Sequence, residues 1–124
     1  MKVQLPIVVK NEIVNKKHVF ETEERDFEVD MSLACQMRWE TKFPELAKTE
    51  TVVDYGQRTA KMSSTNAAVI LSKLKFLYCL FDTEMSFIQF VKMFDFTSED
   101  YVKGLIARIE EIFQLVLDSS SEKN

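Results

Sequence analysis

Few side chains in this 124-residue sequence could carry out chemistry. His18 is the single histidine, so a metal site or a nucleophile–base pair would have to be built on it. It follows Lys16 and Lys17 in an expected strand, and we predict a solvent-exposed histidine there. Cys35 and Cys79 each lie among apolar residues in expected helices, where a thiol is usually a small core residue. We therefore expect two reduced, structural cysteines.

Other patterns of catalysis and ligand binding are also missing from the sequence. Gly56 and Gly104 are the two glycines, so no glycine-rich loop can bring backbone amides to a phosphate. The acidic run 21–26 (ETEERD) lacks the glycine turn and spaced ligands of a calcium loop, and we interpret it as a charged turn or loop. Glu110 and Glu111 point about 100° apart on a helix and do not converge. We expect no enzyme, no catalytic residue, no cofactor and no metal.

Charge and hydropathy exclude two classes of partner. The chain has 16 Lys and Arg against 20 Asp and Glu, a net charge of −4, and its basic residues are scattered. Nucleic-acid binding needs a continuous basic stripe, so we expect none. The longest apolar runs, 67–71 and 76–81, are far shorter than the ~20 residues that cross a bilayer, and no export signal is seen near the N-terminus. We expect an intracellular protein without a membrane partner.

The first thirty residues show the alternation of strands. Apolar side chains occupy every second position over 3–9, which is typical of a strand with one solvated face. Pro6 lacks a backbone donor and favours an edge strand. The segments 18–20 and 27–29 repeat the pattern over shorter stretches. We predict a small sheet or hairpin over residues 1–30.

From residue 30 onward the apolar period becomes helical. We expect a helix that is capped by Asp30 or Ser32 and ends at Pro44, and others over 45–62, from Ser63 or Ser64 to Phe81, from Ser86 to Asp95, and from 97–100 to about 118. The predicted fold is mainly α, with about five helices and a small N-terminal β-strand or hairpin element. One domain covers 1–118, with the helical part at 31–118, and 119–124 form a flexible tail.

Two of these helices carry much apolar surface. In the last one, at about 100° per residue, the apolar side chains fall within an arc of about 140°. They are Tyr101, Val102, Leu105, Ile106, Ile109, Ile112, Phe113 and Val116. Over residues 69–81 apolar side chains lie nearly all round the helix, which must be covered on every side. Either everything packs into one core, or some surface is left for self-association or for a client protein.

The segment 38–45 (RWETKFPE) stands out as a candidate binding element. On its helix, Leu33 and Met37 share one face, whereas Cys35 and Trp39 share another. Trp39 with Phe43 either anchors the turn between two helices in the core or, together with Arg38, anchors an interface, because Trp and Arg are enriched at binding hot spots. The candidate protein-binding residues are Arg38, Trp39, Phe43, Phe87, Phe90 and Phe94.

Several segments together resemble the tail assembly chaperones of long-tailed (siphovirus-type) bacteriophages or prophages. These segments are RWETKFPE, DYGQR at 54–58, LKFLYCLF at 74–81, FIQFVKMFD at 87–95 and the closing SSSEKN. The resemblance covers roughly residues 31–124, and the first thirty residues add little to it.

The resemblance implies a mainly helical, self-associating protein without catalysis. It would bind the tape measure protein, keep that aggregation-prone chain soluble and help recruit tail tube subunits. It would act in the cytoplasm of the infected bacterium and be absent from the mature virion. The alternatives are a structural phage protein, such as a head–tail connector or tail component, another small protein-interaction module, or a small enzyme or regulator that uses Cys35 or Cys79.

Overall fold

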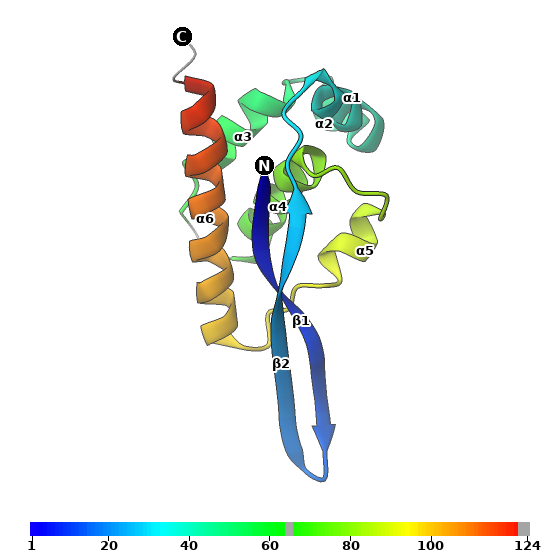
Figure 1. Ribbon diagram of the computed structural model, residues 1–124, viewed down its shortest axis with the longest axis vertical. Coiled ribbons are helices and arrows are strands. Elements are labelled where there is room, and N and C mark those ends of the chain that lie inside the picture. Colours follow the sequence, from blue (N-terminus) through cyan, green and yellow to red (C-terminus); the bar gives the residue numbers. More distant parts are fainter. Residues whose placement is uncertain (64–65, 122–124) are drawn as a thin grey trace.

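The computed structural model describes residues 1–63 and 66–121, with side chains through residue 117. Helices account for 53% of the protein and strands for 23%. The described part holds one two-stranded antiparallel sheet and six helices (Figure 1). The prediction of a mainly α fold with about five helices is therefore wrong, and the fold is mixed α/β. The hairpin is longer than a small element, and one expected helix splits into two.

β1 (Lys2–Val14) and β2 (Lys17–Glu28) form one long antiparallel hairpin. Its turn is Asn15-Lys16, with φ angles of 53° and 65°. Two consecutive residues with positive φ are typical of the tight turn whose twist matches that of the paired strands. A β-bulge interrupts the pairing between Val8 and Lys10. The turn end of the hairpin projects away from the helices (Figure 1).

The acidic run 21–26, expected as a turn or loop, lies inside β2. Its six side chains are exposed, so the segment has no apolar alternation that hydropathy could detect. Its backbone nevertheless pairs with β1 from Gln4 to Lys10, and Gln4 Nε2 donates to Asp26 Oδ1 at 2.8 Å. Pairing with a partner strand, rather than burial, forms this part of the sheet.

α4 (Ala67–Leu80) is the central helix. It is buried over most of its length, as a helix that is apolar on every side must be. The Asn66 side chain caps it by accepting from Val69 N. Ser63 lies before this cap, so it is not the first residue as expected, and Ser64 lies outside the described residues. α4 contacts α1, α3 and α5.

α6 (Glu99–Ser121) is amphipathic as predicted. Seven of the eight apolar residues in the expected arc are buried, namely Tyr101, Val102, Leu105, Ile109, Ile112, Phe113 and Val116. The helix is fastened to β1 because Tyr101 Oη donates to Pro6 O at 2.7 Å and Arg108 Nη1 donates to Gln4 O at 3.0 Å. It continues to Ser121, and residues 122–124 of the expected tail lie outside the described part.

The remaining helices are short. α1 (Leu33–Lys42) is capped by Ser32, as expected, and Pro44 opens α2 (Pro44–Ala47) as its first residue. The helix expected over 45–62 is instead α2 followed by α3 (Val52–Ala60), because the Thr51 side chain accepts from Asp54 N and starts a new helix. α5 (Phe87–Val91) begins at the predicted cap Ser86, which forms a capping box with Gln89.

α3 approaches α4 closely at Gly56. A Cβ added there would lie 2.3 Å from Cε1 of Phe76, a side chain that is only 1% exposed. A glycine is therefore required at this contact, and it sets how tightly the two helices pack.

Candidate functional site

α1 has two apolar faces, as predicted, and the structure buries one of them and exposes the other. Cys35 and Trp39 are 5% and 0% exposed and point into the core. Leu33 and Met37, four residues apart on the other face, are 86% and 69% exposed. Met31, just before the helix, is 39% exposed. α1 thus presents two large apolar side chains to solvent, one helical turn apart.

A shallow depression of about 290 Å³ lies beside Met37, and its lining also includes Ala34, Arg38, Thr41 and Lys42. We call Leu33, Met37 and this depression the α1 outer face. It combines apolar surface with two cations at its border. Contiguous exposed apolar surface on a small domain usually marks a binding site.

Arg38 has a structural position rather than an exposed one. Its guanidinium donates to the carbonyl oxygens of Cys79 (2.7 Å), Leu80 (3.4 Å) and Asp30 (3.2 Å), and it pairs with Asp30 Oδ2 at 3.3 Å. These bonds fasten the end of α4 to the segment before α1. Hydrogen bonds from Ser32 and then the Arg38 guanidinium hold the pKa of the Asp30 carboxyl below its usual range.

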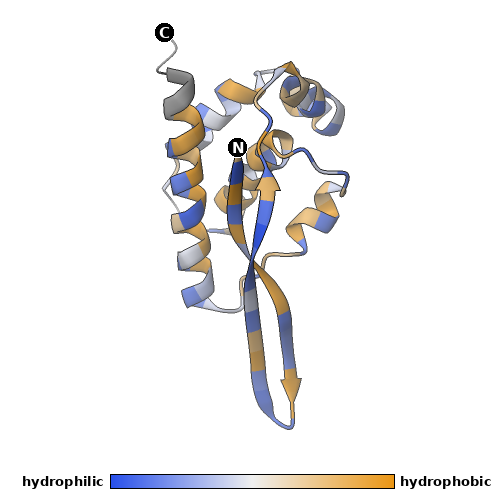
Figure 2. Ribbon diagram, in the orientation of Figure 1, coloured by the Kyte–Doolittle hydropathy of each residue, from blue (hydrophilic) through white to orange (hydrophobic). Residues whose placement is uncertain are grey.

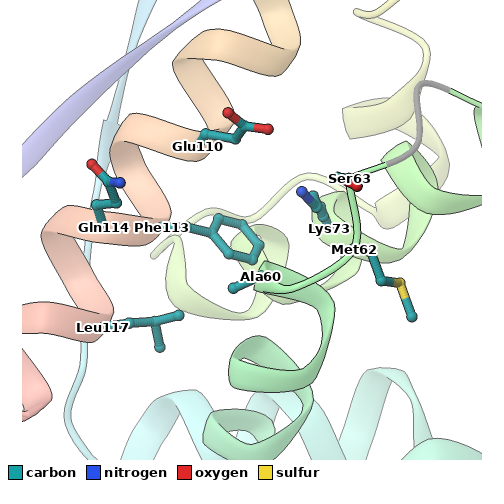
Figure 3. A pocket seen from close by; sticks show the side chains of 8 residues that line it. All are labelled: Ala60, Met62, Ser63, Lys73, Glu110, Phe113, Gln114 and Leu117. Carbon is teal, nitrogen blue, oxygen red and sulfur yellow. The ribbon is translucent and has the colours of Figure 1, made fainter.

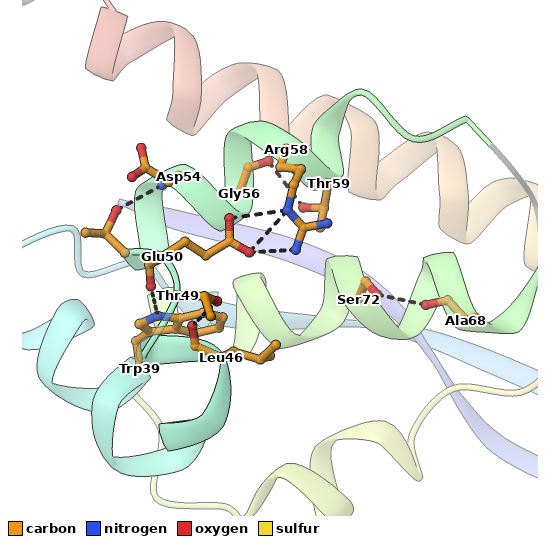
Figure 4. Close-up of polar contacts among 11 residues, drawn as sticks. Trp39, Leu46, Thr49, Glu50, Asp54, Gly56, Arg58, Thr59, Ala68 and Ser72 are labelled. Carbon is orange, nitrogen blue, oxygen red and sulfur yellow. Dashed lines mark hydrogen bonds and ion pairs between the residues drawn. The ribbon is translucent and has the colours of Figure 1, made fainter.

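Trp39 is enclosed by its own chain. Its Nε1 donates to Glu50 O at 2.9 Å, and the Glu50 carboxylate is bound by the Arg58 guanidinium, with Nη2 to Oε1 at 2.6 Å (Figure 4). Its ring packs against Tyr55 and Phe43, with centroids 4.7 and 5.6 Å away. Trp39 therefore anchors the turn between α1 and α2 in the core, the first of the two alternatives open from the sequence.

The four candidate phenylalanines pack on one another, with Phe90 buried and Phe43, Phe87 and Phe94 half-buried. Phe90 is 0% exposed, with Phe87 and Phe94 on either side at 6.4 and 5.2 Å between ring centroids. Phe43 reaches across from α1 to Phe87 at 5.1 Å. These rings hold α5 against α1 and α4 through edge-to-face contacts.

The structure thus places Trp39 and Phe90 in the core, Phe43, Phe87 and Phe94 half-buried against it, and Arg38 at a joint between elements. Trp39 and Phe90 expose no surface, so a partner could reach them only if the domain opened. A protein-binding role for the six residues stays a prediction. Sequence reasoning did not select Leu33 and Met37, although the recognised second apolar face of this helix was the signal that could have found them.

A second exposed apolar region lies on the hairpin. Residues 9–20, which we call the outer hairpin, expose Ile13 (76%), Val14 (42%) and Val9 (48%). Orange segments mark apolar residues on both of its strands (Figure 2). A two-stranded hairpin with few covering side chains is marginally stable in water.

The outer hairpin is held only near its base. Asn11 Nδ2 donates to Asp95 Oδ2 at 2.6 Å and to Thr97 Oγ1 at 3.0 Å. Hydrogen bonds from Thr97 lower the pKa of the Asp95 carboxyl. The carboxyl is therefore ionised when it accepts from Asn11. Phe20 packs edge-to-face on Tyr101 at 5.6 Å. The apolar turn end beyond these contacts is free to meet another molecule.

His18, Cys35 and Cys79 are the residues whose side chains were considered for chemistry, and the structure separates the exposed histidine from the two buried cysteines. His18 is exposed on β2, as predicted, and its Nε2 lies 2.6 Å from Asn11 Oδ1. Cys35 and Cys79 are unpaired and buried, as predicted. Burial raises the pKa of the Cys79 thiol to about 12 and that of Cys35 above its usual value, so both are protonated at neutral pH. Within residues 1–63 and 66–121, no cluster of His, Cys, Asp or Glu could hold a metal ion.

Comparison with known proteins gives no guide to the family. No family model, curated protein or solved structure matches this chain significantly. None of the helices in the described part is long and apolar enough to span a bilayer. The function must therefore be inferred from the surfaces that the chain presents.

Proposed function

We propose that this chain is a non-catalytic protein-binding domain that holds an apolar helical segment of another protein on the α1 outer face. The observation that supports the proposal is the 86% and 69% exposure of Leu33 and Met37, on a helix whose opposite face is buried. A folded domain gains nothing from keeping two large apolar side chains in water. A partner that covers them gains about 1.5–3 kcal/mol for each buried side chain.

The α1 outer face suits a helix that binds through apolar residues one turn apart. The depression beside Met37 can receive one anchor side chain, and the unbranched methionine can adapt to anchors of different shape. Lys42, exposed at the border, favours a client segment with an acidic residue beside its apolar ones.

Within this class, we propose a tail assembly chaperone of a long-tailed bacteriophage, as the resemblance of residues 31–124 implies. The client is then the tape measure protein, and the domain helps to recruit tail tube subunits to it. This role places the domain in the cytoplasm of the host bacterium and outside the mature virion. Spare apolar helix surface and a net charge of −4 support this role, because a chaperone must hold apolar segments while remaining in solution.

The proposal requires a tape measure gene in the same genome, and co-expression of this chain with the product of that gene tests it. The double variant Leu33→Glu/Met37→Glu should leave the domain folded, because both side chains are exposed, yet lose capture of the tape measure protein. We expect the soluble fraction of the client and its yield in a pull-down to fall about tenfold or more. Leu71→Glu is the matched control, because it also replaces an exposed apolar residue, which is 39% exposed and lies near the N-terminal end of α4, outside the α1 outer face. This variant should behave as wild type.

Two results would contradict the proposal. One is a tape measure protein that is equally soluble with and without this chain and forms no complex with it. The other is a double variant that captures the client as well as wild type does, which would move the binding surface away from α1. Mass spectrometry of purified virions separates the chaperone from a permanent particle component, because only the second is retained.

We also propose that the outer hairpin carries self-association. Ile13 and Val14 are consecutive in β1, so their side chains lie on opposite faces of the hairpin, and a second hairpin packed on either face would cover one of them. Ile13→Glu/Val14→Glu should convert an oligomer into monomers, as measured by light scattering after gel filtration, whereas Lys17→Glu, at an exposed polar site beside the turn, should not. A wild-type chain that is monomeric at high concentration would refute this part of the proposal.

A further inference from the structure

Lys73 of α4 is only 5% exposed, although lysine is almost never buried without a partner. Its Nζ lies 5.8 Å from the centroid of the Phe113 ring, and this is the one interaction of the ammonium among the described residues. No carboxylate of the described part comes within the 4.0 Å of an ion pair. Among the described residues no side-chain nitrogen or oxygen is both fully buried and without a hydrogen-bond partner, so the Nζ keeps contact with the space beside it although the rest of the side chain is buried. No described side chain supplies a negative charge to this ammonium.

The ammonium borders a cavity of about 350 Å³, a volume at the lower end for small-molecule sites. Three helices and one connection line it: Ala60 of α3, Met62 and Ser63 after it, Lys73 of α4, and Glu110, Phe113, Gln114 and Leu117 of α6. The side chains of Lys73 on α4 and Phe113 on α6 approach each other at the cavity (Figure 3). The walls are thus apolar on several sides, with polar groups from Ser63 and Gln114.

The charges in the cavity are unequal in strength. Lys73 is buried, where a charge interacts strongly because little water screens it. Glu110 also lines the cavity, but its side chain is exposed, so water and salt screen it. An anion in the cavity is therefore attracted by Lys73 more than it is repelled by Glu110.

We propose that this cavity binds a small monocarboxylate that carries an apolar body. The carboxylate pairs with the Lys73 ammonium, which has no ion-pair partner among the described residues. The body lies against Phe113, Met62 and Leu117, which form the apolar wall. A neutral ligand of the same shape would leave the ammonium unpaired and bind more weakly. The site is separate from the α1 outer face and does not depend on it.

Titration of the full chain with phenylpropionate, followed by backbone amide NMR, tests this inference. We expect saturable shifts at the residues of α4 and α6 around the cavity at millimolar concentration, and about tenfold weaker binding of the uncharged amide of the same acid. A titration without saturable shifts, or equal affinities for acid and amide, would overturn the proposal.

Three variants separate recognition from folding. Lys73→Met keeps the apolar stem, so the domain should melt at the same or a higher temperature while affinity for phenylpropionate falls about tenfold or more. Lys75→Met, two residues further along α4 with its Nζ 5.9 Å from the Phe43 ring centroid, should bind as wild type. Glu110→Gln should strengthen binding about threefold, because a repulsive charge is removed. Full affinity in Lys73→Met, or weaker binding in Glu110→Gln, would contradict the assignment.

Discussion

Replacing Gly56 with alanine should destabilise the domain by about 3 kcal/mol, near the upper end of the cost of overpacking a core. The added Cβ would lie 2.3, 2.5 and 2.7 Å from Cε1, Cζ and Cδ1 of Phe76, distances that atoms do not adopt. The Phe76 ring cannot move away, because it is 1% exposed and packs on Phe113 at 5.0 Å between centroids. α3 must then separate from α4.

Gly104 provides the matched control, because a Cβ added there meets nothing within 4 Å. Gly104→Ala should therefore stabilise α6 by about 0.5–1 kcal/mol, the usual gain at an open helical site. Urea unfolding of both variants measures the contrast. Shortening the facing ring by Phe76→Leu should recover part of the loss in Gly56→Ala. Equal stability of the two alanine variants would show that α3 and α4 are not packed as described.

Arg38→Met should cost about 2–4 kcal/mol, although the residue lies at the edge of the apolar α1 outer face. The substitution keeps most of the apolar stem but removes the donor to the carbonyl oxygens of Cys79 and Asp30 and to Asp30 Oδ2. Leu80 O loses one of its two donors, because it still accepts from Asp30 N at 2.8 Å. The Arg38 side chain is only 22% exposed, so water replaces these bonds incompletely. Lysine should recover less than half of the loss, because a single ammonium cannot reach several acceptors in a fork.

Lys42→Met is the control on the same helix, at an exposed position, and should change the unfolding free energy by less than about 0.5 kcal/mol. Thermal and urea unfolding give the readout. If Arg38→Met were as stable as wild type yet lost client binding, Arg38 would be an interface anchor, which is the second interpretation of the sequence.

The contribution of the Asp30 carboxylate to stability has a defined pH dependence. Because the folded-state pKa is lowered, this contribution is present above about pH 4 and is lost as pH falls through the lowered pKa.

The long, regular patterns were predictable from the sequence. The burial of α6 follows from periodicity, because a helix at the edge of a core turns its apolar arc toward that core. The burial of α4 follows because its apolar residues leave no polar face for solvent. The hairpin was only partly predictable. Its acidic run has no buried side, and the turn at Asn15-Lys16 contains no glycine, so neither hydropathy nor turn composition signals a strand of this length.

The candidate site shows a different limit. Residue type favours Trp39 as a binding hot spot, yet the helix carries apolar residues on two sides, and local sequence cannot tell which side the core covers. That choice is made by the elements that pack on α1, namely α2, α3 with Tyr55, and α4, and the last two lie beyond the local sequence. Trp39 is therefore buried, and Met37, the less conspicuous residue, is exposed.

The hydrogen bonds between α6 and β1 affect how the chain can fold during translation. The two hydrogen bonds that join them connect residues 95 and 104 positions apart. A ribosome therefore releases the hairpin and all the preceding helices before the segment that covers them has emerged. Closing so wide a loop is slow, and the nascent chain meanwhile exposes the surface that will become its interior. The proposed chaperone would therefore itself need a chaperone while it is being translated.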